Sequence, residues 1–180
     1  MALTGSYLTL DDGRTAVRLT RTYARPRDHV WAYVTDPAQL RHWFPSAFEA
    51  GELSPGAPIR FYDDPHAPDT AEATGTVLTA DAPRHLSYSW GADELRFDLE
   101  PLPDGGTRLT LTDVLERSDT AARTAAGWDV CLSALDAADR GAASDGAHAG
   151  SRAPWKELYD AYRAAGFPSG APVPGLDDLS

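Results

Sequence analysis

Hydrophobic and polar residues alternate along much of the first two thirds of the chain, which is the pattern of β-strands with one buried face. In the segment AVRLTRTYA (residues 16–24), alternation places Val17, Leu19 and Arg21 on one side. Six further strand-like segments follow with short turns between them, over residues 48–53, 58–62, 70–80, 84–90, 94–101 and 107–116. Consecutive strands joined by short turns predict an antiparallel meander. Gly75, inside the third of these segments, predicts a bulge or bend.

Helical periodicity marks the other parts of the sequence. Two short helices are expected at residues 27–34 and 37–44, with Thr35 or Asp36 as the cap of the second and Pro37 at its first position. Residues 154–165 have the spacing of a short amphipathic helix.

The longest predicted helix covers residues 120–140. Its apolar stripe has the spacing i, i+3, i+4, i+7 and consists of Trp128, Cys131, Leu132 and Leu135. Ser118 or Asp119 is the expected cap, and Gly141 follows the helix end. A single long helix beside a large sheet must bury this stripe against the sheet, so the sequence predicts an α+β domain with a pocket between the two.

The chain of 180 residues has the length of one domain. We expect an N-terminal arm over residues 1–15, with a turn at residues 11–13, the folded domain over 16–167, and a disordered Pro/Gly-rich tail over 168–180.

The net charge of −11 argues against nucleic-acid binding, for which a basic surface is expected. No stretch approaches the roughly 20 apolar residues of a membrane span, and the N-terminus lacks the pattern of a signal peptide. Cys131 is the one cysteine, so no intrachain disulfide can form, which fits the reducing cytoplasm. Its place on the apolar stripe favours a packed thiol over a nucleophile.

Several segments resemble one known family. VWAYVTDPAQLRHWFP (residues 30–45) resembles its helix–turn–helix segment, PRHLSYSW (83–90) its central strand, and TRLTLTDVLE (107–116) with AAGWDVCLSALDAA (125–138) its last strand and long helix. PWKELYDAYRAAG (154–166) is similar to a short closing helix of bacterial members. Together they resemble the START-like, helix-grip SRPBCC superfamily, in the branch named after activators of the ninety-kilodalton heat-shock protein ATPase.

The resemblance spans about residues 16–167. It implies a helix-grip fold, in which a curved antiparallel sheet wraps around a long C-terminal helix and two short helices follow the first strand. It also implies a mostly apolar cavity. Superfamily members bind lipids, sterols, hormones or polyketides, and some are cyclases or aromatases. At position 113 the branch often has His or another polar residue, so the aspartate of this chain puts His-based chemistry in doubt.

Asp113 is the first candidate for chemistry. Alternation with Leu109, Leu111 and Leu115 points it toward the long helix, where an ionised carboxylate needs a donor or a raised pKa. It is then a ligand anchor or a general base. The alternative is that the strand end or a bulge turns it to solvent.

Aromatic residues form the second candidate feature, because many fall at inward positions. A large aromatic ligand would suit them, although the same residues also make an ordinary core. The hydroxyl of Tyr88 has three candidate partners: a ligand, Asp113 or the backbone. The expected cavity residues are Trp43, Phe44, Phe61, Tyr88, Trp90, Phe97, Leu99, Leu111, Asp113, Trp128 and Leu132.

No motif predicts a metal, a nucleotide or another cofactor. Asp63, Asp64 and His66 share one loop and could contact a cation, but a solvated acidic loop is the simpler interpretation. We therefore expect no cofactor and no metal.

Three functional hypotheses remain. The first is a cytoplasmic module that binds a small hydrophobic molecule without catalysis. The second is a polyketide cyclase or aromatase-like enzyme that uses Asp113 as acid or base. The third is a protein-partner role, such as a chaperone cofactor, in which the acidic second part of the chain docks a basic partner; residues 61–180 carry 21 Asp/Glu and nine Lys/Arg.

Overall fold

The fold of the chain was analysed in a computed structural model, which describes residues 3–62, 71–142 and 153–173. Eight strands and the helices succeed one another in the order β1 (Gly5–Thr9), β2 (Thr15–Tyr23), α1 (Arg27–Thr35), α2 (Pro37–Leu40), β3 (Ala47–Ala50), β4 (Pro58–Tyr62), β5 (Ala71–Asp81), β6 (His85–Trp90), β7 (Asp93–Pro101), β8 (Thr107–Leu115), the 3-10 turn η1 (Ser118–Thr120), α3 (Ala121–Asp139) and α4 (Ala153–Ala164).

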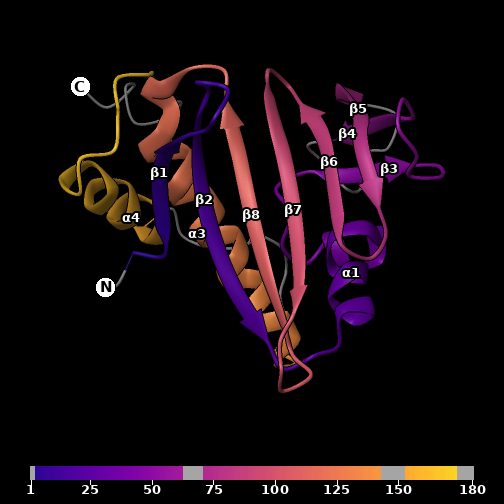
Figure 1. Cartoon of the computed structure of the whole chain (residues 1–180). Helices are drawn as coiled ribbons and strands as arrows, with labels where there is room; N and C mark the ends of the chain where they lie inside the picture. Colours follow the sequence, from indigo (N-terminus) through magenta and orange to yellow (C-terminus); the bar gives the residue numbers. More distant parts are fainter. Residues whose placement is uncertain (1–2, 63–70, 143–152, 174–180) are drawn as a thin grey trace.

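The strands form one sheet in the order β1-β2-β8-β7-β6-β5-β4-β3, and every neighbouring pair is antiparallel. The meander of six strands predicted from the alternation is confirmed as β3 to β8. The last strand of this meander, β8, pairs with β2, so β1 and β2 extend the sheet beyond β8. Figure 1 shows the strands side by side in this order, with α3 running along β2 and β8.

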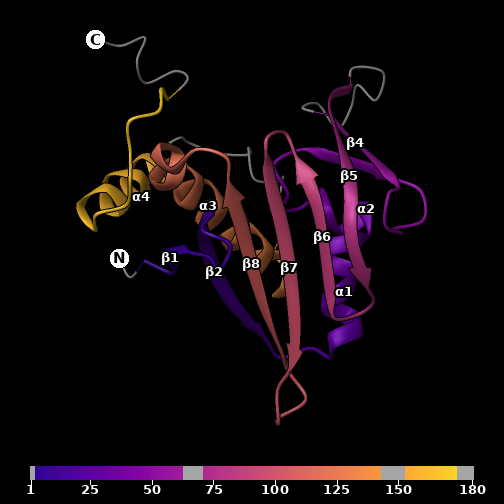
Figure 2. The ribbon, with the colours of Figure 1, turned by 45° about the horizontal axis from the view of Figure 1, so that its top comes forward.

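The long helix packs on one face of the sheet, as its apolar stripe predicts. Trp128, Cys131, Leu132 and Leu135 are all buried on α3 and belong to the same core cluster as the inward residues of β2, β7 and β8. Figure 2 shows α1 and α2 near the β5–β6 side of the sheet, while α4 lies beyond β1 next to α3. The observed architecture is the helix-grip α+β fold.

Local details follow the sequence closely at several helix ends. The Asp36 side chain accepts a hydrogen bond from the Ala38 backbone N–H and caps α2, and Pro37 occupies the first turn. This helix ends at Leu40, earlier than expected, although Trp43 and Phe44 still reach the core. Gly141, with φ of 75°, follows the end of α3 as predicted.

Other details correct the expectations. Neither Ser118 nor Asp119 caps α3: Thr120 is the N-cap residue, and its side chain makes no capping bond. The bulge predicted at Gly75 lies elsewhere, since the register of β5 against β6 shifts between Val77 and Thr79. Gly75 is required for another reason. A Cβ atom there would lie 2.1 Å from the Ser89 carbonyl oxygen, so only glycine fits.

The ends of the chain are more ordered than expected. Residues 5–9 of the expected arm form β1 and pair with β2, while the turn at residues 11–13 is confirmed. Residues 168–173 of the expected disordered tail pack against η1 and the start of α3, where the Ala122 N–H donates to the Pro168 carbonyl and the Gly170 N–H to the Asp119 carbonyl. Residues 174–180 lie outside the described residues, as do Asp63, Asp64 and His66 with their proposed cation contact.

Candidate ligand site between the sheet and the long helix

Asp113 lies inside the fold, on the face of β8 that packs against α3. Its side chain is fully buried. The Trp128 indole Nε1–H donates a hydrogen bond of 2.7 Å to Asp113 Oδ2, whereas Oδ1 has no partner among the described residues. The predicted inward direction is therefore confirmed. The alternative of a strand end turned to solvent is wrong, because β8 remains paired with both β2 and β7 beyond this position.

The electrostatics of Asp113 follow from this burial. The pKa of the Asp113 carboxyl is raised from 3.8 to about 8, mainly because the group is removed from water and to a smaller extent because the carboxyl of Asp93 lies nearby. The hydrogen bond from Trp128 acts in the opposite direction but is the smaller effect. The carboxyl therefore holds its proton at neutral pH.

Tyr88 is the second buried polar group at this place. Across the sheet, Tyr88 of β6 is paired with Leu95 of β7, and Leu95 with Asp113 of β8, so the three side chains form one row on the inner face. The Tyr88 side chain is fully buried, and its hydroxyl has no hydrogen-bond partner among the described residues. Burial, with a smaller contribution from Asp113, raises the pKa of Tyr88 well above its ordinary value. Neither Asp113 nor the backbone is the partner that the sequence suggested for this hydroxyl.

Aromatic rings surround the row on both sides. The Trp128 ring lies 5.4 Å from Trp90 and 5.7 Å from Phe44, measured between centroids, and Tyr88 lies 5.8 Å from Phe97. Phe61 stacks on Phe44 and contacts Tyr88. All of these rings are buried except Trp90, which is half-buried at the end of β6.

The predicted site residues do not all meet at one point. Trp43 contacts Trp128 and Phe97, and its indole N–H donates to the Tyr33 carbonyl, so it is a satisfied core residue. Leu99 lies four residues beyond Leu95 on β7, roughly 13 Å along the strand, and is remote from Asp113. Leu111 and Leu132 are buried in the common core next to this region.

One residue at the site was missed by the sequence reasoning. Asp93 precedes the strand expected over residues 94–101, but it is the first residue of β7 and has the same inward parity as Leu95 and Phe97. It is half-buried, and its Oδ1 accepts a hydrogen bond from the Glu116 backbone N–H. Burial raises the pKa of Asp93, although the Glu116 N–H offsets part of this effect. The alternation of Phe97 and Leu95, extended by two residues toward the start of β7, would have placed Asp93 on the inner face.

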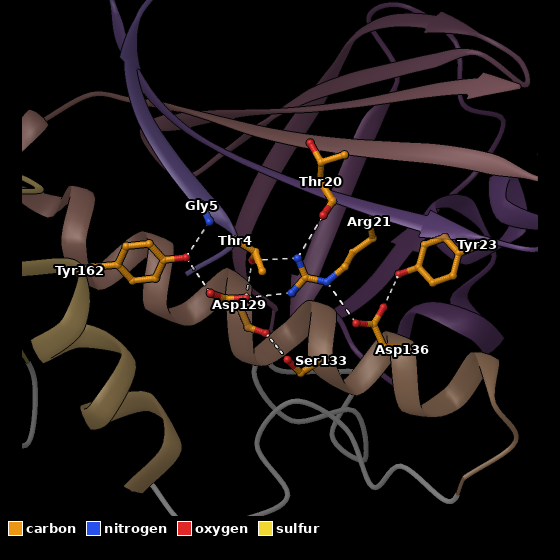
Figure 3. Close-up of polar contacts among 9 residues, drawn as sticks. All are labelled: Thr4, Gly5, Thr20, Arg21, Tyr23, Asp129, Ser133, Asp136 and Tyr162. Atoms are coloured by element: carbon orange, nitrogen blue, oxygen red, sulfur yellow. Dashed lines mark hydrogen bonds and ion pairs between the residues drawn. The ribbon is translucent and has the colours of Figure 1, made fainter. Parts of the chain in front are cut away.

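A second buried polar cluster lies where β2, α3 and α4 meet, and it is compared with the site below (Figure 3). Arg21 of β2 donates to Asp129 and Asp136 of α3 at 2.8 and 3.1 Å. The Tyr162 hydroxyl of α4 donates to Asp129 Oδ2 at 2.6 Å and accepts from the Gly5 N–H at 2.9 Å. No polar side-chain atom of Arg21, Asp129 or Tyr162 in this described part of the chain is among the buried atoms without a partner. We call this cluster the Arg21 network.

Other features do not compete with this site. An open hollow of about 580 Å³ lies between α4 and the segment after it, and it contains none of the predicted site residues. Within the described ranges, no group of three or more His, Cys, Asp or Glu side chains is arranged to hold a metal ion. None of the helices over these same residues combines the length and the apolarity that a transmembrane span requires.

Comparisons with known proteins agree with the fold. The family model described as "Activator of Hsp90 ATPase homolog 1-like protein" matches residues 24–138. CalU16 from Micromonospora echinospora has a similar structure, with 24% sequence identity and a TM-score of 0.67 over 91% of this chain and 98% of that chain. A conserved protein of unknown function from Enterococcus faecalis, EF2215, is 21% identical with a TM-score of 0.70 over 91% of each chain.

A third similar structure is DynU16, a protein from the dynemicin biosynthetic locus, with 22% identity and a TM-score of 0.57 over 73% of this chain and 50% of that one. No curated protein matches the sequence. At these identities, the three solved structures establish only the fold that they share with this chain.

Proposed function

We propose that this chain, which belongs to the family of activator of Hsp90 ATPase homolog 1-like proteins, binds a small, largely hydrophobic molecule between its sheet and the first half of α3. The observation that carries the proposal is a pair of buried polar atoms without partners, Asp113 Oδ1 and the Tyr88 hydroxyl oxygen, on one row of the inner sheet face.

Unpaired buried polar atoms are costly. Each one is destabilising by roughly 1–3 kcal/mol relative to a paired one, and native proteins keep few of them. Two such atoms in a single row among aromatic rings are therefore better explained by a ligand than by packing. A ligand that hydrogen-bonds to both atoms would recover this free energy on binding.

The end of the site near the β6–β7 turn supplies the route of access. Trp90 and Asp93 are half-buried there, whereas the row beneath them, Tyr88 to Asp113, is fully buried. The Trp90 ring lies against Trp128 and Phe44, so we expect a rotation of Trp90 to expose the hydrogen-bonded pair of Trp128 and Asp113. A hydrophobic ligand that enters there replaces contacts between the core rings by contacts between those rings and itself. The buried apolar area therefore changes little on binding.

Nuclear magnetic resonance of the five tryptophan indole N–H groups tests this proposal. Aromatic and aliphatic alcohols, such as 2-(naphthalen-2-yl)ethanol and decanol, would be titrated into ¹⁵N-labelled protein, with the indole signals assigned by single Trp→Phe variants. We expect the Trp128 signal to shift first and most, because its N–H bonds to Asp113. Trp155 on α4 is the internal control, since it lies outside the site.

The thermal unfolding midpoint gives a second readout, because a ligand that binds only the folded state raises it with concentration. A panel of hydrophobic molecules that neither raises this midpoint nor moves the Trp128 signal would exclude the proposal. A shift confined to Trp155 would place binding on α4 and exclude it equally.

One observation favours catalysis as a second candidate function. A carboxyl with a pKa of about 8 is protonated at neutral pH and is suited to act as a general acid, as in a cyclase acting on a polyketide-like substrate. Asp113→Asn keeps the shape but cannot transfer a proton. If a substrate is found among the binding molecules, we expect this variant to bind it and to lose at least about 100-fold in kcat; unchanged turnover would exclude Asp113 as the acid.

A further inference from the structure

We infer that the ligand of the proposed site carries a positively charged amine beside its hydrophobic body, and that the amine binds Asp113 Oδ1. This inference rests on the proposed function and adds the chemical class of the ligand. It follows from the charges around Asp113, from their contrast with the Arg21 network, and from the rings that line the place.

The groups that face Asp113 are acidic or neutral. Leu95 of β7 and Val17 of β2 flank it in the sheet, Trp128 faces it from α3, and Tyr88 lies one strand further on. Asp93 is the diagonal neighbour on β7, roughly 7–8 Å away between Cα atoms. No cation among the described residues lowers the pKa of Asp113.

The surroundings of Asp93 continue the acidic character. The Glu116 carboxylate raises the pKa of Asp93, although by less than the Glu116 backbone N–H lowers it, and Arg123 lowers it by the smallest amount. Arg123 is itself engaged by the Pro172 carbonyl at the surface. Among the described residues, the access end of the site therefore has three carboxyls, Asp93, Asp113 and Glu116, and two arginines at its periphery, Arg117 and Arg123.

In the same fold, the aspartates of α3 are paired with arginines. Asp129 and Asp136 of α3 bind Arg21, and Asp139 binds Arg25. Asp113 faces the same helix from the neighbouring strand and has no such arginine among the described residues. A cation supplied by the ligand would fill at Asp113 the role that Arg21 fills at Asp129.

The rings favour a cation over a neutral donor. The Trp128 indole contacts Asp113, and Trp90 and Phe44 pack around Trp128. Aromatic faces attract ammonium groups, most strongly where water is excluded. A neutral hydroxyl would satisfy Oδ1 without forming an ion pair, whereas an ammonium pairs with the ionised carboxylate of Asp113 and is attracted by the acidic groups beside it. An anion would form no such pair.

Matched probes separate the charge from the hydrophobic body. 2-(Naphthalen-2-yl)ethylamine and 2-(naphthalen-2-yl)ethanol share one ring system, and decylamine and decanol share one chain. Dissociation constants at pH 7.5 would be taken from the shift of the Trp128 indole signal. We expect each amine to bind at least about tenfold more tightly than its alcohol, because a hydrogen bond between two ionised groups is stronger than a neutral one.

The pH dependence gives an independent signature. An ammonium binds the carboxylate form, so binding at pH 6 must displace the proton of Asp113. We therefore expect affinity for the amines to rise between pH 6 and pH 8 and affinity for the alcohols to stay constant. Calorimetry in phosphate and in Tris at pH 6.5, two buffers with different heats of ionisation, should show proton release for the amines alone.

Asp113→Asn is the decisive variant. It should bring the amine affinity down to that of the alcohol and abolish the proton release, while the alcohol affinity changes by less than about threefold. Asp98→Asn, on the outer face of β7, is the matched control and should retain the preference for the amines.

The possible failures are distinguishable. Alcohols that bind at the Trp128 signal as tightly as the amines would overturn the inference and leave the proposed function intact. Failure of both members of each pair to move that signal would overturn the proposed function as well. An amine preference that survives Asp113→Asn would also overturn the inference, since it assigns the cation to another carboxylate.

Discussion

Two buried polar clusters contact the same helix from two neighbouring strands of the sheet, and they differ in how completely they are paired. In the Arg21 network, Asp129 Oδ1 accepts hydrogen bonds from Arg21 and Thr4, and Asp129 Oδ2 accepts one from Tyr162. At the candidate site, Asp113 accepts one hydrogen bond, from Trp128, and Oδ1 has no partner in the described chain. Both carboxyls are almost fully buried.

This difference indicates which of the two clusters stabilises the fold. A buried carboxylate is tolerated when a guanidinium and additional donors compensate its charge, as at Asp129. Asp129 thereby joins β1, β2 and α4 to α3. Asp113 joins only β8 to α3, and it does so with half of its hydrogen-bonding capacity. A cluster that costs stability without joining further elements is better suited to binding than to folding.

The largest loss of stability is expected from a substitution that breaks the Arg21 network. Arg21→Met keeps most of the side-chain length but leaves Asp129 buried without a cation, since the side chains of Arg21 and Asp129 are only 11% and 6% exposed. Removing one partner of such a pair typically costs about 3–5 kcal/mol. We expect a loss of this size in the free energy of unfolding, measured by urea denaturation.

The control lies on the same strand. Arg18 faces the outer side of β2, and its guanidinium donates to the Thr112 hydroxyl, so Arg18→Met should cost less than about 1 kcal/mol. Equal losses for the two variants would mean that the Arg21 network contributes no more than a surface arginine, and the comparison would fail.

The pH dependence of the free energy of unfolding probes Asp113 at the candidate site. The pKa of Asp113 is about 8 in the folded chain and near 3.8 when unfolded, so between these values the folded state binds more protons. Stability therefore falls as the pH rises from about 4 to about 8, by up to about 1.4 kcal/mol per pH unit from this group. Asp113→Asn removes this contribution.

Urea denaturation at pH 5 and pH 7.5 tests this expectation. The variant should gain on the order of 3 kcal/mol relative to the unsubstituted chain between these two values. Asp98→Asn, half-exposed on the outer face of the sheet, should run parallel to the unsubstituted chain. If Asp113→Asn also runs parallel, the Asp113 carboxyl is ionised in the folded protein, and its burial is compensated by a partner.

The two clusters also show what the sequence can predict. Alternation placed Asp113 on the inner face because a strand has a fixed period of two, and the apolar stripe placed Trp128 opposite it. That periodicity also predicted β2 to β8 and the long helix. It could not reveal that Trp128 donates to Asp113, because that contact depends on the side-chain conformations of both residues.

The Arg21 network could not be predicted from the sequence, for a different reason. Arg21 and Asp129 are 108 positions apart, and Tyr162 lies on α4, so their meeting depends on how four elements pack. The same holds for residues 168–173, whose composition suggests disorder but whose backbone bonds to Asp119 and Ala122. Asp93 was missed because its turn-like neighbours, Gly91 and Ala92, hid the start of β7.

A smaller loss of stability is expected from a substitution of Tyr162, through which the Arg21 network binds α4. Tyr162→Phe removes the donor to Asp129 and the acceptor for the Gly5 N–H, and both partners are left in a buried place. The expected loss is about 1–3 kcal/mol in the free energy of unfolding. Tyr159→Phe on the same helix is the control, because this ring is partly exposed and stacked on Trp155, and it should change stability by less than about 0.5 kcal/mol. A Tyr162→Phe variant as stable as this control would show that the network does not depend on the hydroxyl.

The smallest effect is expected from the same substitution at the candidate site. Tyr88→Phe removes a buried hydroxyl that has no partner among the described residues, so its loss leaves no donor or acceptor unpaired there. We expect the free energy of unfolding to stay the same or to rise by up to about 1 kcal/mol, the opposite sign to Tyr162→Phe. Urea denaturation of the two variants under one condition makes the comparison direct, since both replace a buried tyrosine by phenylalanine. Destabilisation of Tyr88→Phe by as much as Tyr162→Phe would mean that the hydroxyl of Tyr88 is paired in solution, and it would remove half of the observation on which the binding site rests. Unchanged stability combined with weaker binding of the alcohol probes would assign this hydroxyl to the ligand.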